Sequence, residues 1–278
     1  TNSALSSIAA KRRKIPIFHM EAGNRCFDFN VPEEINRRIV DVISDINLTY
    51  SKIAREYLIK ENFPANQIIT TGSPLKEVVN AYSKQTGNSN ILKKLKVKEK
   101  KFYLYSFHRE ENVDNQESLD EILDSIEYLS NRDNLPIIVS THPRTKDKVQ
   151  RLNNNDNILF HKPFGYFDYL KLQTSAKCVV SDSGTISEES SILKFPAVTI
   201  RNTNERPEAF EEGVLIMSGV KKERIIYAID YIVERTKNIG RKVKLVADYD
   251  VDNVSEKVVS AILSYTPFIK NKVWGKIE

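Results

Sequence analysis

The stretch Ser-Asp-Ser-Gly-Thr-Ile-Ser-Glu-Glu at residues 181–189 follows an apolar segment at residues 178–180 and opens a helical pattern. Gly184 lets the backbone approach a ligand closely, and the N–H groups of a first helical turn favour an anion. The stretch therefore predicts either a phosphate site or an ordinary helix start in which Ser183 or Thr185 is the cap.

A second charged loop favours the phosphate interpretation. After another apolar segment at residues 197–200, the chain continues to Glu205, Arg206 and Glu208. Loops at the carboxyl ends of parallel strands are where open α/β sheets bind ligands. Because both loops follow predicted strands, we expect both at a ligand-binding edge.

Strand and helix patterns alternate along the chain, which predicts parallel sheets in an α/β fold. The predicted strands are 15–20, 46–50, 68–71, 102–107, 137–141, 158–160, 178–181 and 197–201. The predicted helices are 4–10, 32–43, 119–129, 167–175, 186–193 and 254–265, with two more opened by Ser51 and Pro74. In the helix at 32–43, Ile35, Ile39 and Ile43 form one apolar stripe.

A domain boundary is predicted where this alternation stops, because the sequence turns polar and loses periodicity after residue 84. We expect an N-terminal domain at residues 1–84, a linker at 85–101 and a C-terminal domain at 102–250. The last helix, within 251–278, follows a complete series and is expected to return to the first domain. The first domain holds only three predicted strands and begins inside a helical pattern, so we expect that an N-terminal part is absent.

Composition indicates a globular protein in a reducing compartment. The 278 residues are 40% hydrophobic, and no apolar run is long enough to cross a bilayer. The first residues lack the pattern of a signal peptide, so we expect a cytoplasmic protein. Cys26 and Cys178 show no pairing pattern, and we expect Cys178 to be a small buried apolar side chain.

The net charge of +5 fits an anionic substrate as well as a nucleic acid. The basic runs at residues 11–14 and 93–101 contain no aromatic side chains on which bases would stack, so we do not expect nucleic-acid binding. The four histidines are scattered and give no metal-ligand spacing, so we expect no metal site.

Two carboxylates are candidates for acid–base chemistry. Glu21 ends a predicted strand and Glu33 begins a predicted helix, with one short loop between them. Two carboxylates in one environment have their pKa values pushed apart, which suits one as base and the other as acid. The alternative is structural: Glu33 stabilises the start of its helix, and Glu21 pairs with Arg25 or Arg37.

His108 and Arg109 follow another predicted strand at its carboxyl end. An imidazole beside a guanidinium suits a diphosphate, as a hydrogen-bond donor and a bidentate fork, whereas a solvated charged loop is the alternative. The run at residues 142–144, His-Pro-Arg, ends the next strand and could join the same rim. Tyr166 and Tyr169 could stack on a base.

Together the motifs resemble those of the non-hydrolysing UDP-N-acetylglucosamine 2-epimerases. The matching segments are His-Met-Glu-Ala-Gly-Asn-Arg-Cys-Phe-Asp at 19–28, Pro-Glu-Glu-Ile-Asn-Arg at 32–37, His-Arg-Glu-Glu-Asn at 108–112, the stretch at 181–189, and Glu-Arg-Pro-Glu-Ala at 205–209. They occur in the family's order and span essentially the whole chain. The resemblance implies an α/β fold of two Rossmann-like domains of the GT-B type with the active site in the cleft between them, the first domain being truncated at its N-terminus.

The resemblance also implies residue roles and a reaction. The candidate UDP-binding residues are Arg109, Tyr169, Ser183, Gly184, Thr185, Glu189 and Arg206, and the candidate catalytic residues are Glu21, Glu33 and His108. Glu189 would accept from the ribose, Tyr169 would lie near uracil, and Arg206 would contact the diphosphate. In the family reaction the C2 proton is removed, UDP leaves to give a 2-acetamidoglycal, and UDP adds back with C2 inverted. The resemblance implies a UDP-sugar substrate, no metal or redox cofactor, no membrane partner and a homodimer.

Departures from the family pattern favour one branch. Residues 24–26 are Asn-Arg-Cys where the common form has Leu-Arg-Thr, and residues 184–186 are Gly-Thr-Ile where it has Gly-Gly-Ile. This resembles the branch that acts on modified amino sugars for capsule or O-antigen, such as UDP-N-acetyl-L-fucosamine synthase or the 2,3-diacetamido-sugar epimerases. The family's Gly-Thr-Arg-Pro-Glu loop, and the Gly-Asp expected before Thr1, are missing from the given residues, which would remove a nucleotide-binding arginine and an active-site aspartate.

Two alternatives stay open. A GT-B glycosyltransferase would use the same nucleotide site but transfer the sugar to an acceptor, although the pairing of Glu21 with Glu33 favours proton chemistry. A truncated chain could also bind UDP without turning a substrate over.

Overall fold

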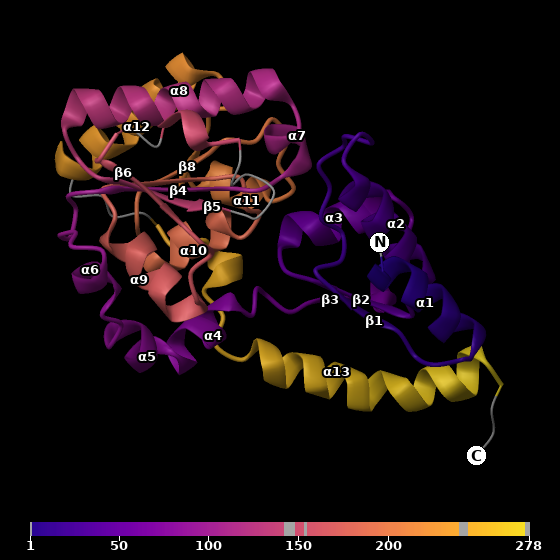
Figure 1. The fold of residues 1–278 in the computed structure, drawn as a ribbon. Coiled ribbons are helices and arrows are strands. Elements are labelled where there is room, and N and C mark those ends of the chain that lie inside the picture. Colours follow the sequence, from indigo (N-terminus) through magenta and orange to yellow (C-terminus); the bar gives the residue numbers. More distant parts are fainter. Residues whose placement is uncertain (1, 142–147, 153–154, 239–243, 276–278) are drawn as a thin grey trace. The chain divides into compact units, whose positions relative to one another are not determined.

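Parallel strand pairing organises the whole chain in the computed structural model, which describes residues 2–141, 148–152, 155–238 and 244–275 (Figure 1). The chain forms two compact units. Unit 1 comprises Thr1–Val78, Thr203–Glu208 and Val246–Glu278, and unit 2 comprises Val79–Asn202 and Ala209–Leu245. Unit 1 holds a three-stranded sheet and unit 2 a six-stranded sheet, so the predicted α/β class is confirmed.

Unit 1 has a small sheet covered on both faces. Its strands, in sheet order, are β1 (Phe18–Met20), β2 (Ile46–Thr49) and β3 (Ile68–Thr70). Its helices are α1 (Asn2–Arg12), α2 (Pro32–Ile43), α3 (Lys52–Lys60) and α13 (Val254–Phe268), and α4 (Leu75–Ala81) leads into unit 2. Single turns lie at Ala65–Gln67, Ala247–Tyr249 and Ile269–Val273.

Alternation along the strands decides which helix covers which face of this sheet. Ile46 and Leu48 pack in one cluster with Ala261 of α13, whereas Ile68 packs with Leu58 of α3. Figure 1 accordingly shows α13 on one side of β1–β3 and α3 on the other.

Unit 2 is a doubly wound sheet in the order β6-β5-β4-β7-β8-β9. Its strands are β4 (Tyr103–Phe107), β5 (Ile137–Thr141), β6 (Ile158–His161), β7 (Cys178–Ser181), β8 (Ala197–Thr199) and β9 (Ile216–Met217). Its helices are α5 (Ser83–Gly87), α6 (Ile91–Lys94), α7 (Glu110–Val113), α8 (Gln116–Asp133), α9 (Tyr166–Ser175), α10 (Ile186–Leu193) and α12 (Lys222–Asn238), with α11 (Pro207–Glu211) at the junction with unit 1 and a single turn at Gln150–Leu152.

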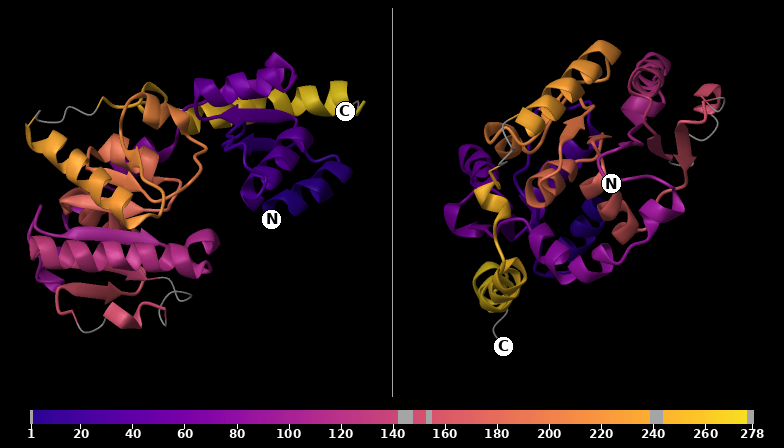
Figure 2. Two further views of the ribbon diagram at one scale, coloured as in Figure 1. Left: turned by 90° about the horizontal axis from the view of Figure 1, so that it is seen from above. Right: turned by 90° about the vertical axis from the view of Figure 1, so that its left-hand side faces the viewer.

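The strand order of unit 2 reverses between β4 and β7. The chain runs from β4 outward to β5 and β6, and then returns to β7 on the other side of β4. Helices α8 and α12 lie side by side over one face, and α9 and α10 lie over the other (Figures 1 and 2). In such sheets ligands bind where the order reverses, outside the carboxyl ends of the strands. The loops after β4 and β7 are therefore the first place to look for a site.

The main apolar core lies between the sheet of unit 2 and the pair α8 and α12. It contains alternate residues of the central strands, such as Tyr105 and Val180, packed against Ile122 of α8 and Ile229 of α12. Cys178 belongs to this core and is fully buried, which confirms the prediction for its side chain. Among the described residues, no helix has both the length and the apolar character that crossing a bilayer requires.

Helix α2 buries a charged face instead of its apolar stripe. It begins and ends at the predicted residues, but Ile35 is 46% exposed and Ile39 is 37% exposed, whereas Glu34 and Asp41 are buried. The apolar stripe of this helix is therefore not its most buried face. A buried carboxylate needs charged or hydrogen-bonding partners, so the inward face of α2 must be holding polar groups.

Candidate functional site

Asp182 joins the two loops at the point where the sheet order reverses. Its Oδ2 accepts hydrogen bonds from the backbone N–H groups of His108 and Arg109, both at 2.9 Å, and from Asn112 Nδ2 at 3.1 Å. Arg109 also donates from Nε to the carbonyl oxygen of Asp182 at 2.9 Å. Because Asp182 is fully buried, these donors replace water around its carboxylate and fix the loop after β4 against the loop after β7.

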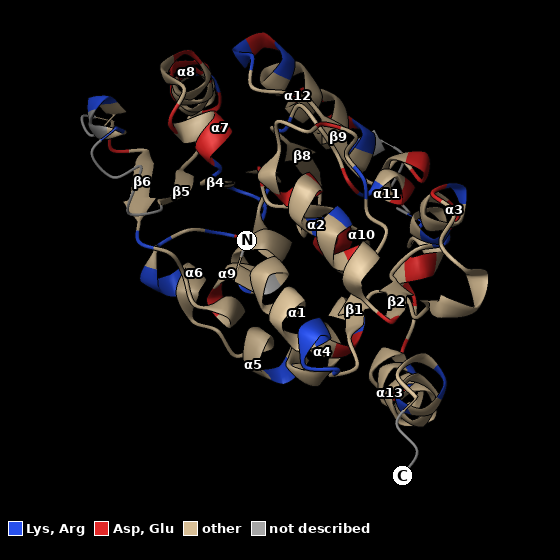
Figure 3. Ribbon diagram, turned by 90° about the vertical axis from the view of Figure 1, so that its right-hand side faces the viewer, with Lys and Arg blue, Asp and Glu red and all other residues tan. Residues whose placement is uncertain are grey.

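The same carboxylate favours the protonated form of His108. His108 Nδ1 lies 3.1 Å from Asp182 Oδ1, and this contact raises the pKa of His108 although burial opposes the charge. Burial alone would raise the pKa of Asp182, but the bonds from His108 and Arg109 hold that pKa below its usual value. The imidazole is still 51% exposed, so it can meet a ligand. Figure 3 shows the acidic helix α7 shortly after the end of β4.

The side chain of Thr185 does not cap the helix α10. Thr185 occupies the N-cap position, but its hydroxyl donates to Glu189 Oε1 at 3.1 Å instead of capping the helix. Glu189 also accepts from Gln173 Nε2 at 2.6 Å. Ser183 and Gly184 are partly exposed at this turn. Of the two possible caps, Thr185 does not serve, whereas Ser183 Oγ accepts a long hydrogen bond of 3.4 Å from the Thr185 N–H. The partly exposed N-terminus of α10 also suits an anion, so both interpretations of this stretch stay open.

Tyr169 lies in the first turn of α9 with its hydroxyl toward the strand ends. Burial raises its pKa, the charge of Glu189 adds to this, and the hydroxyls of Ser106 and Ser181 act in the other direction. Ser106 belongs to β4 and Ser181 ends β7. Tyr169 is therefore one of the side chains gathered where the sheet order reverses.

In unit 1, Glu21 follows β1 and is bound by Arg206. Arg206 Nη2 donates to Glu21 Oε1 at 2.8 Å, and Asn24 Nδ2 donates to the same oxygen at 3.2 Å. Arg37 Nη2 lies 4.0 Å away, at the limit of an ion pair. Of the two structural partners predicted for Glu21, Arg25 binds other carboxylates and Arg37 is only a distant neighbour. Arg206 itself is buried, so the pairing offsets part of the cost of burying its charge.

The second predicted carboxylate, Glu33, is exposed in the first turn of α2 and shares no described contact with Glu21. Its neighbour Glu34 is the buried one and accepts from the Cys26 N–H at 2.9 Å. The run at residues 142–144, which we expected at the rim, lies outside the described residues.

Two residues of this site were not singled out from the sequence. Asp182 has no assigned role in the sequence analysis, although an aspartate directly after a fully buried strand must find polar partners. Gln173 is held against Glu189, yet a glutamine within a helical pattern gives no signal of that contact.

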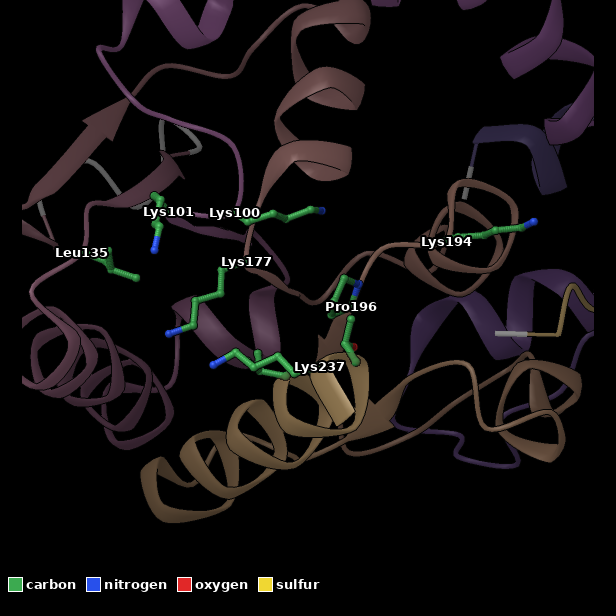
Figure 4. Close-up of a pocket in the computed structure, with 9 residues that line it drawn as sticks. Lys100, Lys101, Leu135, Lys177, Lys194, Pro196 and Lys237 are labelled. Carbon is green, nitrogen blue, oxygen red and sulfur yellow. The ribbon is translucent and has the colours of Figure 1, made fainter. Parts of the chain in front are cut away.

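A pocket of about 360 Å³ lies at the opposite edge of the unit 2 sheet (Figure 4). Its basic lining residues are Lys100, Lys101, Lys177, Lys194 and Lys237. Helix C-termini end at this edge and attract cations. Lys100 Nζ donates to the carbonyl oxygens of Thr174 and Ala176 at the end of α9, and Lys194 is the C-cap of α10 and points away in Figure 4. Lys100 thus stabilises the end of α9, and Lys177 pairs with Asp133 at 2.8 Å. The sequence-predicted site residues do not line this pocket.

Comparison with known proteins finds the family that the motifs resemble. The profile of a family described as UDP-N-acetylglucosamine 2-epimerase matches residues 1–263. The chain is 35% identical over 248 residues to the UDP-N-acetylglucosamine 2-epimerase of Methanocaldococcus jannaschii, covering 86% of this chain and 68% of that protein. The chain thus spans about two thirds of the length of this relative.

Two solved structures share the fold. The UDP-N-acetylglucosamine 2-epimerase of Rickettsia bellii superposes with a TM-score of 0.92 at 48% identity, covering 99% of this chain and 74% of that one. The Methanocaldococcus jannaschii enzyme, solved in complex with UDP-GlcNAc and UDP, gives a TM-score of 0.85 at 33% identity, covering 95% and 74%. These two structures confirm the predicted α/β fold of the GT-B type.

Proposed function

The chain belongs to the UDP-N-acetylglucosamine 2-epimerase family, and we propose that it inverts C2 of a UDP-linked 2-acetamido sugar. The observation that carries the proposal is the position of Asp182. One buried carboxylate holds the imidazole of His108 and also begins the turn that leads into α10. A hydrogen-bond donor and a helix start that favours an anion on one carboxylate support the proposal, because a leaving diphosphate needs both.

The UDP part of the substrate is assigned to unit 2 and to Arg206. We assign the diphosphate to Ser183, Gly184 and Thr185 at the start of α10, with Arg206 as a bidentate partner. Arg109 is held by the Asp182 carbonyl oxygen and is a second guanidinium for the phosphates.

The nucleoside is assigned to two further residues of unit 2. Glu189 would accept a hydrogen bond from the ribose, and its contact with Gln173 supports this because it fixes the carboxylate. Tyr169 would lie beside uracil, consistent with its place near the ends of β4 and β7.

The chemical step is assigned to Glu21, Glu33 and His108. Inversion at C2 needs a proton removed from one face and returned to the other, which two carboxylates can share. As the C2 proton leaves, a C1–C2 double bond forms and the C1–O bond breaks, its electron pair going to UDP. His108 and Arg206 would stabilise the negative charge that develops on the departing diphosphate. This charge is the largest energetic cost of the step. Re-addition of UDP and protonation from the opposite face complete the reaction.

The proposal also covers the identity of the sugar. The residues at 24–26 and 184–186 depart from the common family pattern, and they favour a modified amino sugar such as UDP-2-acetamido-2,6-dideoxy-L-talose over UDP-GlcNAc. We further propose, from the same resemblance, a cytoplasmic homodimer; light scattering of the purified chain tests the oligomeric state.

The test is a direct assay of the 278-residue chain with both sugars. Proton NMR follows the H2 signals of UDP-GlcNAc and of UDP-2-acetamido-2,6-dideoxy-L-talose, with His108→Ala as the matched control. We expect the C2 epimer to accumulate with one of them, and no epimer with the variant. Calorimetric titration with UDP accompanies the assay. Binding of UDP without epimer or glycal from either sugar would favour a UDP-binding protein over an enzyme.

A further inference from the structure

The buried carboxylate Asp41 holds the turn that carries Glu21. Asp41 Oδ1 lies 2.7 Å from His19 Nδ1, and Asp41 Oδ2 lies 2.7 Å from Arg25 Nη1. The Gly23 N–H donates to both carboxylate oxygens at 3.3 Å. The Asp41 side chain is 0% exposed, so its carboxylate interacts with these three partners and not with water. The three partners lie on both sides of Glu21 in the sequence.

Arg25 anchors the far end of the same turn. Its guanidinium, also 0% exposed, makes a two-pronged contact with the Glu61 carboxylate, at 2.9 Å from Nε and 2.7 Å from Nη2. Its Nη1 donates to the Asn24 carbonyl oxygen at 3.0 Å. Burial would lower the pKa of Arg25, but the bonds to Glu61 and Asp41 raise it above its usual value. The turn is thus tied to α2 and to the end of α3.

The turn needs such anchors because its backbone is strained. Glu21 has a φ of +62°, in the left-handed region that residues other than glycine adopt only at an energetic cost. Gly23 has a φ of +77°, and a Cβ there would overlap the carbonyl oxygen of Ala54. A strained conformation persists only where the surrounding contacts determine it. Here those contacts are the charged groups on the inward face of α2 and at Glu61.

We propose that Asp41 and Arg25 are positioning residues, which hold the turn so that the Glu21 carboxylate stays where it acts on the C2 proton. This inference rests on the proposed function, because only an epimerase uses Glu21 in that way. It also explains why α2 buries Asp41 and leaves Ile35 and Ile39 exposed. On this view the charged face of α2 is turned inward because it holds the turn.

The experiment compares Asp41→Asn with Asp45→Asn in the full 278-residue chain. Asp45 is the matched control because it is also a buried aspartate beside β1, but it accepts from the Ile17 N–H at 2.9 Å and from Lys11, away from the turn. Arg25→Lys is a second test variant, which keeps the charge but loses the two-pronged contact.

The first measurement does not depend on enzymatic activity of the chain. Hydrogen exchange followed by mass spectrometry reports the amides of peptides within residues 19–28. In Asp41→Asn and Arg25→Lys we expect exchange in these peptides to rise at least about tenfold, as local opening predicts, with the core of unit 2 unchanged. Asp45→Asn should leave these peptides as in the parent chain. Unchanged exchange in both test variants would overturn the proposal.

The second measurement separates positioning from general stability. In Asp41→Asn we expect kcat to fall about 10- to 100-fold, with KM changed less than about threefold, because the displaced carboxylate is used in the chemical step and not in binding. Asp45→Asn should keep the parent kcat even if its melting temperature falls. If exchange rises but kcat does not change, the turn is held for stability alone and the proposal is wrong. If the parent chain itself is inactive, the proposed function fails, and the exchange data still decide whether Asp41 and Arg25 hold the turn.

Discussion

Arg206 and Glu21 stand 185 residues apart in sequence and form an ion pair with 2.8 Å between Nη2 and Oε1. The guanidinium is 6% exposed and the carboxylate 36% exposed, so the arginine depends on the pair more than the glutamate does. A proposed diphosphate contact and a proposed acid–base group are thus direct neighbours within unit 1.

Arg206 is therefore the first target for substitution. Arg206→Ala should weaken UDP binding about 10- to 100-fold, because a hydrogen bond to a charged group contributes about 1.5–3 kcal/mol. Calorimetric titration with UDP measures this directly. Arg151→Ala is the control, since Arg151 pairs with exposed Asp124 on the surface of unit 2 and its loss should change the affinity by less than about twofold. Equal affinities for UDP in the parent chain and Arg206→Ala would remove Arg206 from the binding site.

A UDP analogue without ribose hydroxyls tests whether Glu189 contacts the ribose. If its carboxylate accepts from a ribose hydroxyl, Glu189→Gln should weaken UDP binding about tenfold. The affinity for 2′,3′-dideoxy-UDP, which lacks the hydroxyls, should change by less than about twofold. Calorimetric titration of the parent chain and of Glu189→Gln, each with UDP and with 2′,3′-dideoxy-UDP, measures these affinities. A loss of equal size for the two ligands would mean that Glu189 acts by holding Gln173 and Thr185, to which it is bonded, and not by contacting the ribose.

The pair of His108 and Asp182 predicts a specific change in titration. The contact with Asp182 raises the pKa of His108, so Asp182→Asn should bring it down. Proton–carbon NMR of the imidazole measures the midpoint in the parent chain and the variant. The contribution of a raised histidine pKa to stability is present below the unfolded value of about 6.5 and is lost as the pH rises through the folded value. An unchanged midpoint in a folded Asp182→Asn chain would show that His108 takes its proton affinity from another group.

Glu208 predicts a pH dependence of stability with the same sign. Burial raises its pKa, against the hydrogen bond that the Tyr249 hydroxyl donates at 2.7 Å. Its contribution to stability is therefore present below the unfolded glutamate pKa of about 4.3 and declines as the pH rises through the raised folded value.

In Glu208→Gln this decline should disappear. The difference in unfolding free energy between variant and parent, from urea titrations across this range, should shift in favour of the variant as the pH increases. A difference that shifts toward the parent chain would contradict the sign of the pKa change.

Elements with one clear apolar pattern could be predicted from the sequence. For β5, β7 and α10 the predicted and observed bounds coincide, because a short apolar strand or a cleanly marked helix start leaves few alternatives. Helix α12 was not predicted, although Ile225 and Ile229 lie on its buried face. It follows β9, which has only two residues and gives no strand signal, so the alternating pattern in the sequence ends at β8. The expected linker at 85–101 likewise contains the four-residue helix α6.

The candidate site was predictable in its residue types but not in its connections. Motif order places His108 and the 181–189 stretch after strands, and the sheet order then brings their loops together. Periodicity cannot tell which face of α2 is buried, because the charged face is selected by partners on other segments, such as Arg25 and Gly23. Likewise, the partner of Glu21 is Arg206, a contact across 185 residues that no local pattern encodes.

The central claim is that the chain removes and returns the proton at C2, and deuterium incorporation tests it most directly. The UDP-sugar that the chain epimerises is incubated with it in heavy water, and NMR measures deuterium at C2 of the epimer. We predict one deuterium at C2 of essentially every epimer molecule, with incorporation lost in Glu21→Gln. An epimer that keeps its original hydrogen at C2, or incorporation that is unchanged in Glu21→Gln, would contradict the account.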